Sequence, residues 1–181
     1  MTIHHIHQLA APAGRAVGLA LVMCGALAIT PSASAELHRG QKSFGPRVGF
    51  VSRNTSVAAG LEFSVATAEH VRLSPEVSIV FRHKNRDALG IGFNVDFPFE
   101  VAPRFVVYPL VGAQYMSWGL HDEDPETAKD VTTHANRFGG NAGAGIEYYC
   151  TPSLKLNLEG RYTLLSAYST AVVNLGISFV F

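Results

Sequence analysis

The stretch Val173-Asn174-Leu175-Gly176-Ile177-Ser178-Phe179-Val180-Phe181 decides the fold class. Side chains of a β-strand point alternately to its two faces, so one face here is wholly apolar and carries Val173, Leu175, Ile177, Phe179 and Phe181. The other face is mostly polar or small. Soluble proteins rarely present such a strand near a terminus, because chain ends fray and apolar edges aggregate. The pattern is typical of a barrel strand whose outer face meets lipid.

The other end of the chain indicates export. Residues 1–35 carry no acidic side chain, and Arg15 is their only lysine or arginine. An apolar run from Ala16 to Ile29 is followed by small residues in which Ala33 and Ala35 fit an A-x-A cleavage site. The run is short for a transmembrane helix. We therefore expect a signal peptide at residues 1–35 and a single mature domain at residues 36–181.

Charge composition excludes one class of partner. The chain has 14 lysines and arginines against 14 aspartates and glutamates, so its formal net charge is zero. A nucleic-acid-binding protein needs a basic stripe or patch. We therefore expect no nucleic-acid partner.

Eight strand-like segments follow the leader, and none shows a convincing helical period. An even number of antiparallel strands returns the end of the chain to the side where it began, so the last strand can pair with the first and close the sheet. The predicted strands are Ser43–Arg53, Ser56–Ala66, Val71–Phe81, Ala88–Phe99, Arg104–Trp118, Arg137–Tyr149, Leu154–Leu165 and Thr170–Phe181.

The segment Leu154–Leu165 shows how the faces divide, because leucines alternate with Lys155, Asn157, Glu159 and Arg161. A soluble barrel of the lipocalin kind would turn its apolar face inward, and alternation alone does not separate the two arrangements. The leader and the last strand favour the membrane. The prediction is an all-β protein, an eight-stranded antiparallel transmembrane β-barrel with apolar residues toward lipid and charged residues toward the lumen.

Several short motifs in order along the chain carry a family resemblance. They are Leu73-Ser74-Pro75-Glu76, Phe97-Pro98-Phe99, Tyr108-Pro109-Leu110-Val111-Gly112, Gly143-Ala144-Gly145-Ile146-Glu147-Tyr148-Tyr149 and Glu159-Gly160-Arg161-Tyr162, with the last strand after them. The chain resembles small eight-stranded outer-membrane β-barrel proteins of the OmpA/OmpX and opacity type, often labelled porin-like. The resemblance implies location in the bacterial outer membrane. It implies little about activity, because members look like structural, adhesive or uncharacterised surface proteins.

Nine charged residues fall on the face predicted to line the lumen. Eight strands leave an interior just wide enough for side chains, and buried charges need partners. We therefore expect a closed network of ion pairs rather than a catalytic or conducting interior. Its members are Arg47, Glu62, Arg72, Glu76, Asp96, Glu147, Lys155, Glu159 and Arg161.

The combined expectation is a non-enzymatic outer-membrane barrel with a structural or surface-interaction role, without cofactor or metal. Its partners would be outer-membrane lipid, the barrel assembly machinery reading Phe179 and Phe181 as a C-terminal signal, and an extracellular partner bound through a long polar loop, Gly119–Asn136. Two alternatives stay open. One is a small porin that passes solutes; the other is a barrel enzyme acting at the outer rim, where His121 and His134 lie.

Overall fold

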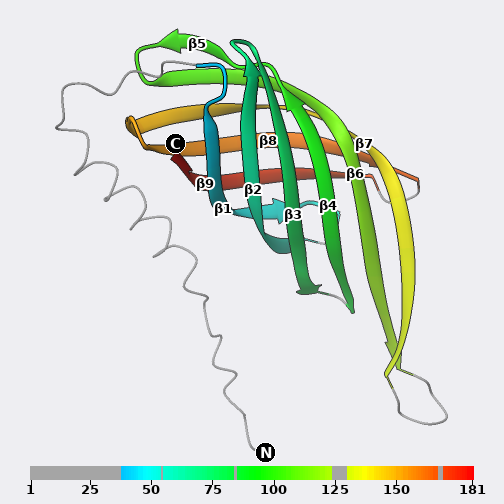
Figure 1. The fold of residues 1–181 in the computed structure, drawn as a ribbon. Helices are drawn as coiled ribbons and strands as arrows, with labels where there is room; N and C mark the ends of the chain where they lie inside the picture. The colour runs from blue at the N-terminus through cyan, green and yellow to red at the C-terminus, as the bar shows by residue number, and fades with distance from the viewer. Residues whose placement is uncertain (1–37, 54, 84, 124–129, 167–168) are drawn as a thin grey trace, which may run out of the picture. The chain divides into compact units, whose positions relative to one another are not determined.

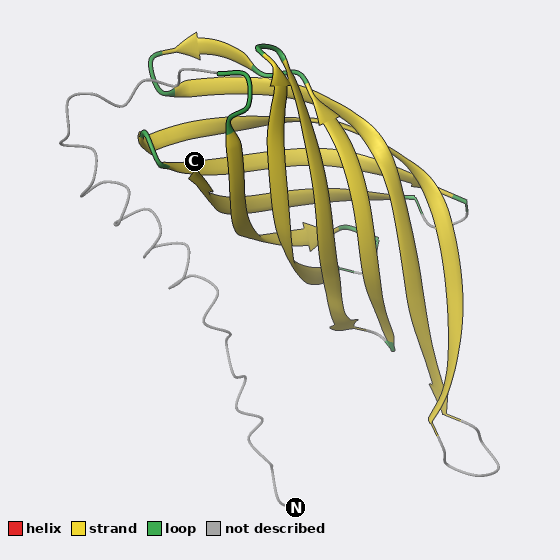
Figure 2. Ribbon diagram, viewed as in Figure 1, coloured by secondary structure: helices red, strands yellow, loops and turns green. Residues whose placement is uncertain are grey.

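The computed structural model describes residues 38–53, 55–83, 85–123, 130–166 and 169–181. Figure 1 shows these residues as a set of long antiparallel strands, and Figure 2 shows that strands make up almost all of them. The expected signal peptide lies outside the described residues. No helix in the described part has the length and hydropathy needed to cross a bilayer.

The strands form one sheet that closes on itself. Its order is β4-β3-β2-β1-β9-β8-β7-β6-β5, and β4 also pairs with β6. The strand bounds are β1 Lys42–Val51, β2 Ser56–Ala68, β3 Val71–His83, β4 Arg86–Asp96, β5 Phe99–Ala102, β6 Phe105–Glu123, β7 Asp130–Thr151, β8 Leu154–Leu165 and β9 Thr170–Val180.

The short strand β5 is a continuation of β4 rather than a ninth barrel strand. β4 ends with Asp96 opposite Leu110 of β6, and β5 resumes with Phe99 opposite Val107. Between them the Phe97 amide donates to the Pro109 carbonyl at 2.9 Å. Pro98 breaks the strand because proline has no N–H to donate to the ladder. Counting β4 and β5 together gives a closed eight-stranded antiparallel barrel, which confirms the predicted fold.

Closure depends on the seam between β1 and β9. Their register runs from Ser43 opposite Val180 to Val51 opposite Val172. Beyond β9, Phe181 and Lys42 exchange two backbone hydrogen bonds of 2.9 Å. The seam therefore gives the last strand a hydrogen-bonding partner and leaves no open sheet edge along it.

Burial alternates along the strands as the sequence pattern predicted, with the apolar side outward. In β9, Val173 and Phe179 are 51% and 58% exposed, whereas Asn174 and Ser178 are 4% and 3% exposed. Such an inside-out arrangement is favourable when lipid surrounds the barrel, because the apolar side chains then lie in hydrocarbon.

The predicted loop Gly119–Asn136 is wrong in its extent. β6 and β7 continue as a paired hairpin through this stretch, with Gly119 opposite His134 and Glu123 opposite Asp130. β4 accompanies β6 only to Leu120, and β8 pairs with β7 only from Gly139. Residues 121–123 thus pair with 130–132 beyond the last β4 pairing, and residues 133–138 of β7 pair only with β6. We call residues 121–123 and 130–138 the arm. The sequence pattern did not predict these strand residues, because apolar and polar residues do not alternate regularly along them.

One predicted turn is also displaced. The predicted strands Ala88–Phe99 and Arg104–Trp118 leave Glu100–Pro103 as the turn between them, but Glu100 and Ala102 belong to β5. The chain reverses at Pro103 and Arg104 instead, where Arg104 has a φ of 88°. Paired positions Ala102 and Phe105 flank this turn.

Candidate functional site

The barrel interior is the candidate site, because the structure places all nine predicted lumen charges there. Each is at most 8% exposed. They come from the inward faces of six strands, β1, β2, β3, β4, β7 and β8. The strand alternation turns them inward, and barrel closure brings them together in two ion-paired clusters.

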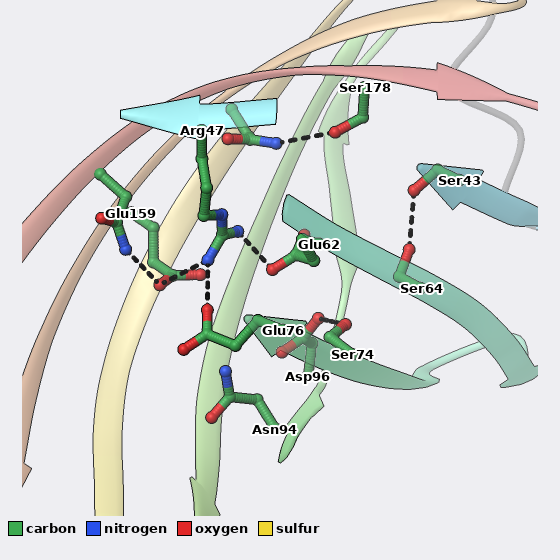
Figure 3. Close-up of polar contacts among 12 residues, drawn as sticks. Ser43, Arg47, Glu62, Ser64, Ser74, Glu76, Asn94, Asp96, Glu159 and Ser178 are labelled. Atoms are coloured by element: carbon green, nitrogen blue, oxygen red, sulfur yellow. Dashed lines mark hydrogen bonds and ion pairs between the residues drawn. The ribbon is translucent and has the colours of Figure 1, made fainter. Parts of the chain in front are cut away.

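The first cluster, the Arg47 cluster, consists of Arg47, Arg161, Glu62, Glu76 and Glu159. Figure 3 shows the Arg47 guanidinium between three carboxylates. Its Nη1 donates to Glu76 Oε2 at 2.8 Å and lies 3.5 Å from Glu159 Oε1, while its Nη2 donates to Glu62. Arg161 pairs with Glu76 and lies 3.3 Å from Glu159 Oε1.

The second cluster, the Arg72 cluster, consists of Arg72, Lys155, Asp96 and Glu147. Arg72 Nε lies 3.0 Å from Asp96 Oδ2, and its Nη1 lies 2.9 Å from Glu147 Oε1. Lys155 Nζ donates to the same Glu147 oxygen at 2.7 Å. Two cations thus face two carboxylates, and the Ser74 hydroxyl also donates to Asp96.

Tyr108 joins the two clusters, although it was not predicted as a member of the network. Its hydroxyl donates to Glu159 Oε2 at 3.3 Å, and the Arg72 guanidinium lies 4.9 Å from the centre of its ring. A cation over an aromatic face is attracted by the ring's negative face. The available signal was its strand position, because Tyr108 shares its inward face with Leu110 and Gln114 of β6.

A layer of neutral polar side chains was missed as well. Asn141 Nδ2 donates to Asn94 Oδ1 and to Gln114 Oε1, both at 3.0 Å. The Thr163 hydroxyl donates to Asn141 Oδ1 at 2.9 Å. These residues also occupy inward positions, so the two-residue strand period predicts that their side chains point into the barrel. The period does not predict which of them form hydrogen bonds with one another.

Apolar layers lie at the two ends of the interior. Toward the arm, buried residues of β1–β4, β6, β8 and β9 pack together: Val51, Ala58, Val80, Ala88, Met116, Trp118, Leu165 and Val172. Toward the end where β1 begins, Val106, Tyr149 and Val180 pack together. The charged and amide layers therefore lie between two apolar ones.

The part of the chain that the structure describes holds no candidate metal centre at the rim. No group of three or more histidine, cysteine, aspartate or glutamate side chains there is arranged to hold a metal ion. The backbone of His134 lies opposite Gly119, and that of His121 opposite Thr132, so the two histidines are not a cross-strand pair.

Phe179 and Phe181 lie on the outer surface, 58% and 68% exposed. They follow the lipid-facing row of β9, as the alternation predicted. Their role as an assembly signal stays a prediction.

Comparisons with known proteins agree with this architecture. The family model for the outer membrane protein beta-barrel domain matches residues 17–181. Among solved structures, the N-terminal β-barrel domain of Pseudomonas aeruginosa OprF has a TM-score of 0.64 at 12% identity, covering 79% of this chain and 98% of its own. No curated protein sequence matches.

Two further structures are similar at comparable identity. A major outer membrane protein from Thermus thermophilus gives a TM-score of 0.60 at 14% identity, over 80% of this chain and 100% of its own. Ail, the attachment invasion locus protein of Yersinia pestis, gives 0.59 at 13% identity, over 80% and 100%. Identities this low show a shared fold and carry no function across.

Proposed function

The chain belongs to the outer membrane protein β-barrel domain family and is a bacterial outer-membrane protein, and from that premise we propose that it is a closed, non-enzymatic barrel with a structural or surface-interaction role. The observation that carries the proposal is the filled interior. Two ion-paired clusters, an amide layer and two apolar layers of buried side chains occupy it among the described residues.

The porin alternative requires a continuous aqueous path, and the packing of the interior argues against one. Trp118 is 1% exposed and Gln114 is 2% exposed, so neither side chain borders a wide channel. Eight-stranded barrels have interiors that side chains fill. The enzyme alternative has no observation that favours it, and the described residues hold no candidate metal centre.

The arm is the element best suited to meet a partner outside the membrane. It extends past the last paired residues of its neighbours, Leu120 beside β4 and Gly139 beside β8. Over residues 130–138, β7 pairs with β6 on one side, and no described strand pairs with it on the other. Connections and projections on a rigid scaffold are common binding elements because they change without disturbing the core.

Conductance through planar bilayers tests the closed barrel directly. Purified monomer reconstituted at neutral pH is expected to give no steady single-channel current, because every inward layer is packed. A reconstituted general porin in the same lipid serves as the positive control. Steady, reproducible currents from the monomer would replace the closed barrel with the porin alternative.

Trimming the arm tests the surface role. Replacing residues 121–132 with a two-residue Asn-Gly turn joins Leu120 to Thr133, both in the paired region of β6 and β7. The variant is expected to insert and to remain heat-modifiable on gels, since no barrel pairing is removed, while attachment of intact cells to host or bacterial surfaces changes. A trimmed protein that no longer assembles would show that the arm is structural and would overturn this part of the proposal.

A further inference from the structure

The buried charges of the barrel do not balance. Among the described residues, the buried acidic side chains are Glu62, Glu76, Asp96, Glu147 and Glu159, and the buried basic ones are Arg47, Arg72, Lys155 and Arg161. If all were ionised, the interior would carry one excess negative charge. An uncompensated charge in a protein interior is strongly destabilising, and the surrounding lipid here offers no water to solvate it.

The excess lies in the Arg47 cluster. The Arg72 cluster has two cations and two carboxylates in direct contact. The Arg47 cluster has two arginines and three glutamates, so it holds the additional carboxylate.

A metal ion is a poor candidate to balance this charge. The space between the three carboxylates is already taken by the Arg47 guanidinium, as Figure 3 shows. The described residues offer no grouping of three or more metal-ligating side chains. The side chains of Arg47 and its three carboxylate partners are also at most 9% exposed, so the cluster has little access to ions in solution. A proton, by contrast, needs no coordination space.

The contacts distinguish Glu62 from the other two glutamates. Glu76 contacts both arginines, and Glu159 contacts both arginines as well as Tyr108 and Asn174. Glu62 has one ion-pair contact in the cluster, to Arg47. It also lies directly opposite Glu76 in the β2–β3 register, a placement that is destabilising for two like charges.

We propose that the folded barrel binds one proton in its interior and holds it on the Glu62 carboxyl. The proton is taken from water as the barrel folds. A neutral Glu62 still accepts the Arg47 hydrogen bond through Oε2, and repulsion between Glu62 and Glu76 disappears. The charged groups that act on Glu62 from the surrounding strands are Arg47 of β1, Glu76 and Arg72 of β3, Asp96 of β4, and Glu159 of β8.

Infrared spectroscopy tests the proposal on the folded protein. At neutral pH the reconstituted wild-type barrel should show the C=O stretching band of a protonated carboxyl, and Glu62→Gln should lack that band. Glu100→Gln is the control, because Glu100 is exposed on β5 and its replacement leaves the interior charge unchanged, so this variant should keep the band. A wild-type spectrum without the band, or a band that persists in Glu62→Gln, would overturn the assignment.

Stability provides an independent readout. Because glutamine has the shape of a protonated glutamate, Glu62→Gln should unfold in urea at or above the wild-type midpoint at neutral pH. Glu147→Gln should raise the unfolding equilibrium constant by about two orders of magnitude or more, as expected when one partner of a buried ion pair is lost. Failure of Glu62→Gln to fold would count against a neutral Glu62.

Discussion

Arg47 contacts three carboxylates from three different strands, and this fixes those strands relative to β1. Glu62 comes from β2, Glu76 from β3 and Glu159 from β8. Removing one member of a buried pair costs about 3–5 kcal/mol, although replacing a whole network with apolar residues is often neutral. The main effect of the cluster is therefore to specify the register of these strands, and its net contribution to the free energy of unfolding is small.

Gly145 makes room for Tyr108. A Cβ atom added at Gly145 would lie 2.3 Å from Tyr108 Cζ and 2.4 Å from its hydroxyl oxygen. We predict that Gly145→Ala displaces the Tyr108 ring, weakens its hydrogen bond to Glu159 and lowers the free energy of unfolding by about 1–3 kcal/mol, the usual cost of overpacking. Urea titration followed by tryptophan fluorescence and gel mobility would measure this loss.

Gly160 is the matched control for that substitution. It belongs to the neighbouring strand β8, and a Cβ there would meet no atom within 4 Å. Gly160→Ala should leave the urea midpoint unchanged or slightly raised, because it reduces the freedom of the unfolded chain. Equal losses in the two variants would show that the effect is general to these strands and that Tyr108 is not its cause.

At the level of elements, the β1–β9 seam has a very tight backbone approach at Gly45. A Cβ added there would lie 1.8 Å from the Ile177 carbonyl oxygen and 2.6 Å from Ser178 Cα, both backbone atoms that cannot rotate away. The neighbouring Pro46 also lacks an N–H. β1 therefore approaches β9 closely at a point where only glycine fits.

Gly45→Ala is accordingly expected to impair closure of the barrel. The variant should show a smaller heat-modifiable fraction on gels than wild type and greater sensitivity to protease in the membrane. Val48→Ala is the control, because Val48 lies on the same strand but is 53% exposed on the outer face. Normal closure in Gly45→Ala would mean that the seam opens easily to admit a methyl group.

At the level of the whole molecule, the interior is obstructed by several layers in series. The apolar layer around Trp118 lies toward the arm, and the amide and charged layers follow it. Each layer is built from a different set of side chains. Loss of one layer therefore leaves the others in place.

We predict that Trp118→Ala destabilises the barrel without opening it. Loss of a buried tryptophan side chain costs about 3–5 kcal/mol through lost transfer energy and the cavity left behind. Planar-bilayer recordings should still show no steady current, since the Arg47 and Arg72 clusters remain paired. Appearance of a stable conductance in Trp118→Ala would identify the apolar layer as the sole barrier.

The sequence by itself determined what depends on local geometry. A two-residue period fixes which side chains share a face, so the inward position of Arg47 and the outward position of Phe179 were predictable. The bounds of β8 were predicted as Leu154–Leu165, the same as in the structure, because apolar and polar residues alternate along most of this segment. The arm escaped prediction because pairing outside the bilayer needs no apolar face.

Only the tertiary structure decided which inward residues meet. Arg47 is separated from Glu62, Glu76 and Glu159 by 15, 29 and 112 residues in sequence. Their contact depends on the register of each ladder and on closure through the β1–β9 seam, which no local period encodes. For the same physical reason, the sequence alone does not show that Glu62 contacts one arginine whereas Glu76 and Glu159 contact two. The proposed proton on Glu62 depends on that difference, which exists only in the closed barrel.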